Sequence, residues 1–214
     1  MRFPPAGVVI ALALAARTDA HRLDEYLQAT RIGIAGDRVN VEIDLTPGVA
    51  VARGIFGLID TDGDGLISKG ESAAYADLVL RSVSLSADDE RRPLRVSESY
   101  VPPFGEMSEG AGIIRVRASA ALPKASRGRH RLIFANGHRP ADSVYLVNAL
   151  VPEDPKIAIV EQKRDRAQQE FTVDYEVGGE VAPVRWLWLP AGLLVGCLWL
   201  VTGMRKRGPT FRSE

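Results

Sequence analysis

Apolar and polar side chains alternate strictly along three short segments of this chain. At 39–45 the apolar residues fill the odd positions and the polar residues the even ones, and the segments 114–119 and 171–177 show the same kind of alternation. Successive side chains of a β-strand point to opposite faces of its sheet, so a period of two predicts strands with one buried face.

Further strand-like segments surround these three. Tyr26–Ile34 precedes Ala35–Asp37, which supplies a hairpin turn before 39–45. The remaining strand candidates are 82–86, 94–101, 129–136, 143–151 and 156–162. Short strands at this spacing predict a mainly β fold, either an antiparallel sandwich or an open barrel, interrupted by one helical segment at 51–80.

The N-terminal residues resemble an export signal. Arg2 is followed by the uncharged run Ala6–Ala16, which is too short to span a bilayer but has the length of a signal-peptide core. We therefore expect 1–20 to be a signal peptide, with cleavage before His21 or at an earlier small residue. The alternative is a buried helix of the domain.

A second uncharged run, Trp186–Met204, lies near the C-terminus. A bilayer core of about 30 Å needs roughly 20 apolar residues in a helix. We expect 183–204 to be a transmembrane helix, 205–214 to be a basic cytoplasmic tail, and 21–182 to be a periplasmic domain on the other side. A sorting tail that is later removed is the alternative. Both ends favour a single-pass membrane protein.

Charge and cysteine content exclude several classes of protein. The chain has 27 Lys and Arg against 27 Asp and Glu, for a net charge of +0, which argues against a nucleic-acid partner. Residues 1–20 carry net +1 and 185–214 carry net +4, so 21–184 must carry −5. The single Cys excludes an intramolecular disulfide framework and a Cys-rich zinc site.

The segment Asp60–Glu71 places oxygen-bearing residues at regular intervals around Gly65. It resembles the calcium loop of the EF-hand family, whose ligands come from positions 1, 3, 5, 7, 9 and 12. The resemblance implies Ca²⁺ bound by the carboxylates of Asp60, Asp62 and Asp64, the backbone carbonyl of Leu66, Ser68 directly or through water, and both oxygens of Glu71. It also implies a positive φ at Gly65, which glycine adopts without steric cost. An acidic, glycine-rich turn without a metal is the alternative.

Helices are expected on both sides of this loop, at 51–59 and 71–80. Their expected contact joins Ile55, Phe56 and Ile59 of the first helix to Ala74, Tyr75 and Leu78 of the second. Only one such loop is present, so Ile67 lacks the second loop with which this position normally pairs. Two interpretations remain: a structural calcium that clamps the helix pair onto the sheet, which we favour, or a dimer that pairs two loops.

Three further segments carry a second resemblance: His21–Thr30, Val41–Gly48 and Ser143–Leu150. They resemble the extracytoplasmic leader domain of some bacterial nickel/cobalt permeases. One membrane span cannot form a transport path, so the resemblance implies at most an accessory of such a permease.

Copper or nickel binding is a related alternative. Cleavage before His21 would leave its α-amine and imidazole as a chelating pair, which His138 or His130 could complete. However, His130 shares a strand face with Leu132 and Phe134, so packing explains it better, and His138 fits a loop contact.

No catalytic signature is present. The sequence lacks a nucleophile elbow and a phosphate-binding loop, and the charged run 88–92 fits a solvated hairpin tip. The sequence therefore predicts a calcium-binding, membrane-anchored, extracytoplasmic binding or scaffold module without enzymatic activity. Its expected partners are the membrane and a metal permease or another envelope protein. An accessory for nickel, cobalt or copper handling is the alternative function.

Overall fold

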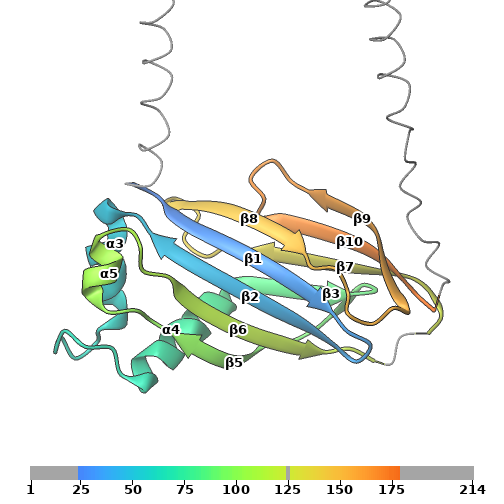
Figure 1. Ribbon diagram of the computed structural model, residues 1–214, viewed down its shortest axis with the longest axis horizontal. Coiled ribbons are helices and arrows are strands. Elements are labelled where there is room, and N and C mark those ends of the chain that lie inside the picture. The colour runs from blue at the N-terminus through green and yellow to red at the C-terminus, as the bar shows by residue number, and fades with distance from the viewer. Residues whose placement is uncertain (1–23, 124–125, 179–214) are drawn as a thin grey trace, which may run out of the picture. The chain divides into compact units, whose positions relative to one another are not determined.

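The computed structural model describes residues 24–123 and 126–178 (Figure 1). The expected signal peptide, His21, the expected transmembrane helix and the basic tail all lie outside these residues. Within the described part of the chain, the helices are too short or too polar to cross a membrane.

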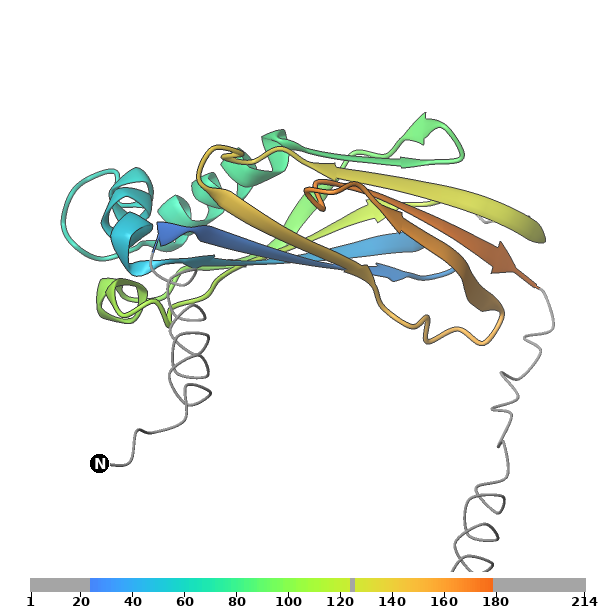
Figure 2. The same cartoon turned by 90° about the horizontal axis from the view of Figure 1, so that it is seen from above.

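The described strands form two five-stranded sheets, seen as separate layers in Figure 2. The first, sheet A, has the order β5 (Arg95–Tyr100), β6 (Ile114–Ala121), β2 (Arg38–Pro47), β1 (Tyr26–Ile34) and β8 (Ser143–Ala149). The second, sheet B, has the order β4 (Glu90–Arg91), β3 (Val83–Ala87), β7 (Gly128–Asn136), β10 (Glu170–Val177) and β9 (Ile157–Arg164). The mainly β prediction is confirmed.

One strand pair differs from the antiparallel arrangement that the sequence predicts. Strand β8 runs parallel to β1, with Tyr26 opposite Ser143 and Ile32 opposite Ala149. The other pairs between described strands are antiparallel, including the expected β1–β2 hairpin, whose turn is closed by a 2.9 Å bond from the Ala35 N–H to the Arg38 carbonyl. A parallel pair needs a long crossover, and here that crossover includes strands of both sheets.

Alternating burial accounts for how the sheets are held together. The apolar residues Val39, Val41, Ile43 and Leu45 of β2 are at most 1% exposed, while the intervening polar side chains face away from the core. Both sheets contribute their apolar faces to a single hydrophobic core. Burial of these side chains removes apolar surface from water, the main stabilising contribution to such a fold.

Within the described residues, three helices accompany the sheets: α3 (Val49–Ile59), α4 (Lys69–Arg81) and α5 (Phe104–Ser108). The expected helices at 51–59 and 71–80 correspond to α3 and α4. Helix α3 buries Ala52, Ile55, Phe56 and Ile59, and α4 buries Ser72, Tyr75, Ala76 and Val79. Of the three residues of α4 expected to meet α3, Tyr75 is buried, whereas Ala74 and Leu78 are exposed. Helix α4 turns a different face inward and packs against β5.

Helix α5 was not expected from the sequence. It has only five residues, too few to show a helical period, and it packs against α3. The rings of Phe56 and Phe104 lie 5.1 Å apart and are tilted by 58°. This contact packs the C-terminal part of α3 against α5, the helix that precedes β6.

Candidate metal centre

The acidic loop joins two helices, as expected. Asp60 follows the last residue of α3, and its backbone N–H donates to the Phe56 carbonyl at 2.9 Å. Ser68 is the N-cap of α4. Residues 60–71 therefore connect the end of α3 to the first turn of α4.

Asp60 organises the first half of the loop. One of its carboxylate oxygens accepts the Gly63 N–H at 2.8 Å, and the other accepts the Gly65 N–H at 3.1 Å. Gly65 has a φ of +81°, so the positive φ expected at this position is confirmed. A residue with a Cβ would be strained there, and the turn keeps the Asp60 carboxylate inside the loop.

Three of the predicted ligand residues come together. One carboxylate oxygen each from Asp60, Asp62 and Glu71 lies within 4.8 Å of the other two. In the described part of the chain this is the only such group of three His, Cys, Asp or Glu side chains, and none of the three forms an ion pair with Lys or Arg there. Like charges this close repel one another, so a cation between them would be favourable.

Glu71 is held by hydrogen bonds to both of its oxygens. Oε1 accepts the Thr61 N–H at 2.6 Å and the Thr61 hydroxyl at 2.9 Å. Oε2 accepts the Ser68 N–H and the Ser68 hydroxyl, both at 2.9 Å. The backbone N–H groups of Ser68 and Thr61 are the largest causes that lower the pKa of Glu71 to about 2. The side chain is therefore a carboxylate at any physiological pH, as a cation ligand must be.

Asp64, another predicted ligand, lies outside the cluster of three carboxylates. Asp64 Oδ1 accepts the Leu66 N–H at 2.8 Å, and the Leu66 side chain is 72% exposed. Ser68 touches the cluster through Glu71. Sequence reasoning missed Thr61, because a residue between two predicted ligands gives no signal that it will orient the ligand at position 12.

Ile67 packs against the hydrophobic core of its own domain. Its side chain thus has a partner without a second loop. This favours the clamp interpretation, since the loop is attached to the core through the residue that would otherwise pair with another loop.

The donors of the loop suit a hard cation. All the side-chain atoms that converge here are oxygens, the ligands that calcium and magnesium prefer, whereas nitrogen and sulfur select transition metals. The residues present therefore fit the group that the sequence predicts, with three carboxylates in place and Ser68 beside them.

The two described histidines are occupied elsewhere. His130 is bonded through Nδ1 to Asp88 Oδ2 at 2.7 Å and through Nε2 to the Ser126 carbonyl at 2.8 Å, and its ring stacks on Tyr175. The hydrogen bond to Asp88 is the largest cause that raises the pKa of His130. The expected hairpin is present, but its tip is shorter than 88–92: Asp88 and Asp89 form it at positive φ, and Glu90–Arg91 form β4. Packing explains His130, as expected, but the bond to Asp88 was not predicted.

His138 is more deeply placed than expected. It is 4% exposed, and its Nε2 lies 3.3 Å from the Tyr75 hydroxyl. The interpretation of His138 as a loop contact therefore understates its role, because it belongs to a buried polar cluster. No sequence pattern predicts that cluster, because its members come from segments far apart in the chain.

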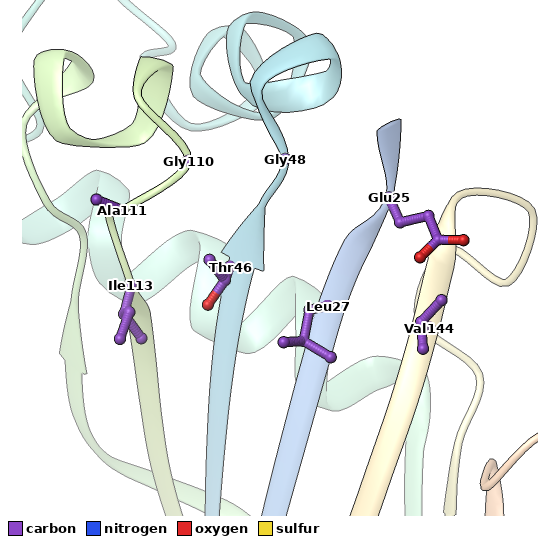
Figure 3. A pocket seen from close by; sticks show the side chains of 8 residues that line it. All are labelled: Glu25, Leu27, Thr46, Gly48, Gly110, Ala111, Ile113 and Val144. Carbon is purple, nitrogen blue, oxygen red and sulfur yellow. The ribbon is translucent and has the colours of Figure 1, made fainter. Parts of the chain in front are cut away.

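A pocket of about 680 Å³ lies on the outer face of sheet A. Figure 3 shows Leu27, Thr46 and Val144 projecting from neighbouring strands as its floor, with Ala111 and Ile113 on one side. Glu25, Gly48 and Gly110 complete the lining. Its size falls in the range of small-molecule sites. The pocket could not be predicted from the sequence, because its lining residues come from separate segments and share no motif.

Comparison with known proteins gives no family for this chain. Neither a protein-family model nor a curated protein matches its sequence. Functional assignment therefore depends on the residues and the geometry of the loop.

Proposed function

We propose that residues 60–71 bind one Ca²⁺ as a single EF-hand. The observation that carries this proposal is the convergence of the Asp60, Asp62 and Glu71 carboxylates around a turn in which Gly65 has a positive φ. Calcium takes six to eight oxygen ligands in flexible geometry. The backbone carbonyl of Leu66, the Ser68 hydroxyl and the Asp64 carboxylate would complete the set.

The proposed role of the ion is structural. Asp60 ends α3 and Glu71 lies in the first turn of α4, so an ion held by both would join the ends of two helices. Each helix buries one face in the domain: Ile59 is 1% exposed and Tyr75 is 3% exposed. A clamp at the loop would therefore fix both helices against the core, without any catalytic step.

The proposed setting is the bacterial envelope. We infer from the sequence that 1–20 direct export and that 183–204 anchor the chain, so that a β-sandwich domain with the calcium loop lies outside the cytoplasm. Extracellular calcium modules bind with dissociation constants of about 10⁻⁴–10⁻³ M, which suits a compartment open to external calcium. Its partner would be another envelope protein, with a metal permease as the candidate that the sequence resemblance suggests.

Calorimetry on the purified full-length chain in detergent tests the proposal. The wild type is expected to bind one Ca²⁺, and the double substitution Asp60→Asn, Glu71→Gln is expected to abolish this binding. Asp77→Asn is the matched control, because Asp77 is an exposed acid on α4 outside the loop. It should bind calcium like the wild type.

The same titration with Ni²⁺ and Cu²⁺ separates the two functions that the sequence left open. Tight binding of a transition metal that survives Asp60→Asn, Glu71→Gln, together with no response to Ca²⁺, would replace calcium binding with transition-metal handling. A calcium response lost in the double variant supports the EF-hand.

A further inference from the structure

A buried hydrogen-bonded contact links helix α4 to the interior of the two sheets. Tyr75 lies four residues after Glu71, so both side chains occupy the same side of α4. The Tyr75 hydroxyl lies 2.8 Å from the Tyr26 hydroxyl on β1 and 3.3 Å from His138 Nε2. Tyr26, Tyr75 and His138 are 0%, 3% and 4% exposed. The helix that begins at the calcium loop therefore places a polar group in the core.

His138 connects this contact to other strands. Its carbonyl accepts hydrogen bonds from Gln28 Nε2 and from the Tyr145 hydroxyl, each at 2.7 Å. Asn136 Nδ2 donates to Gln28 Oε1 at 2.9 Å, and Asn136 Oδ1 accepts the His138 N–H at 3.0 Å. Strands β1 and β8, the end of β7 and the turn after it thus share one network with α4.

A second contact ties the same helix to sheet A. The Ser72 hydroxyl lies 3.0 Å from the Ser99 hydroxyl on β5. Ser72 directly follows Glu71, so the first turn of α4 holds a proposed ligand and a sheet contact side by side. A shift of α4 would break both contacts at once.

Buried polar groups that lose their partners are costly, because water cannot replace the lost hydrogen bond. Displacing α4 would leave the hydroxyls of Tyr26 and Tyr75 and the ring of His138 short of partners. The position of α4 and the integrity of this network are therefore expected to change together.

We infer that calcium binding at residues 60–71 is energetically coupled, through α4 and the Tyr75 hydroxyl, to the buried network on β1, β8 and the turn at His138. The inference rests on the proposed calcium site, and it adds that calcium binding there stabilises the buried network. Coupling between two sites is reciprocal for binding free energies. If the two are coupled, weakening the network from the Tyr75 end is expected to weaken calcium binding, although Tyr75 does not belong to the loop.

Calcium titration of the full-length chain by calorimetry tests this coupling. Tyr75→Phe removes one hydroxyl from the network, and the calcium dissociation constant is expected to rise by about fivefold or more. Tyr100→Phe is the matched control, because it removes a hydroxyl from a tyrosine that is 42% exposed on β5. It should leave the dissociation constant unchanged. In the wild type, calcium should also slow hydrogen exchange along β1, and Tyr75→Phe should reduce that protection.

The outcomes separate the coupling from the calcium site itself. Wild-type calcium binding with an unchanged dissociation constant in Tyr75→Phe would overturn the coupling and leave the proposed function standing. No calcium binding by the wild type would overturn both. If circular dichroism shows that Tyr75→Phe does not fold, Tyr26→Phe removes the other hydroxyl of the pair and is judged by the same fivefold criterion.

Discussion

Ser68 and Glu71 cap helix α4 by binding each other in both directions. The Ser68 N–H and hydroxyl donate to Glu71 Oε2, and the Glu71 N–H donates back to the Ser68 hydroxyl at 3.2 Å. This reciprocal capping box satisfies backbone N–H groups that the first turn of a helix otherwise leaves unpaired. Two residues proposed as calcium ligands are thus oriented by the start of the helix itself.

Ser68→Ala is expected to weaken both the helix and the calcium site. Loss of an N-cap side chain lowers the free energy of unfolding by about 1 kcal/mol. Glu71 Oε2 would also lose a donor, so the calcium dissociation constant should rise. Urea unfolding in chelator measures the first effect, and calorimetry measures the second. Ser84→Ala is the control, because it removes a hydroxyl from an exposed position of β3 that caps no helix. Equal stability of the two variants in chelator would contradict the capping role.

Two glycine-to-alanine changes should have opposite effects. A Cβ at Gly112 would lie 2.8 Å from the Met107 backbone nitrogen and 2.9 Å from Pro102 Cγ. Because backbone must shift to make room, Gly112→Ala is expected to destabilise the domain by about 1–3 kcal/mol. A Cβ at Gly54, within α3, would meet nothing within 4 Å. Gly54→Ala should therefore stabilise by up to about 1 kcal/mol. Thermal unfolding of both variants gives the signs, and a stable Gly112→Ala protein would refute the close packing of this segment.

Burial of His138 predicts a loss of stability in mild acid. Burial is the larger cause, and the charge of Arg139 the smaller, that lower the pKa of His138 from 6.5 to about 4. The unfolded chain therefore binds a proton more readily than the folded chain between these values. The stability contributed by neutral His138 is fully present above about pH 6.5 and is lost as the pH falls toward 4. Urea unfolding between pH 6.5 and 4.5 measures the loss.

A matched variant assigns that loss to His138. His138→Gln should flatten the pH dependence in this window. His130→Gln should keep it, because the pKa of His130 is raised and its contribution is lost at higher pH. Glu71 stays charged throughout the window, with its pKa near 2. An NMR titration that places the pKa of His138 at or above 6.5 would contradict the predicted burial effect.

Most of the strands could be predicted, because their apolar pattern is local; β4 was not among them. The odd-numbered residues of β2 are buried as the period of two requires, and β1 has the predicted bounds Tyr26–Ile34. The turn between α3 and α4 could also be predicted, because Gly65 and its acidic neighbours occupy fixed positions along the chain. In each case the signal lies within a few residues of the feature it specifies.

Features that depend on distant partners could not be predicted in this way. Strand β8 lies beside β1 in parallel, which no local pattern indicates. Asp174 occupies a polar position of an alternating segment, yet it is 5% exposed because Arg129 and Arg131 bind its carboxylate. The face of α4 that is buried, which includes Ser72 and Ala76, depends on the strand against which the helix packs, and the helix sequence alone does not specify it.

The parallel pairing of β8 with β1 also has a consequence for the order in which sheet A can form. Strand β2 follows β1 directly and can pair with one side of it, β6 can then pair with β2, and β5 with β6. The opposite side of β1 waits for residues 143–149, which follow most of the domain. Until they arrive, that side presents unpaired N–H and C=O groups, which attract foreign strands. The earliest strand of the domain is therefore shielded only by one of the latest, and a chain interrupted before Ser143 would leave its first strand open to a neighbour.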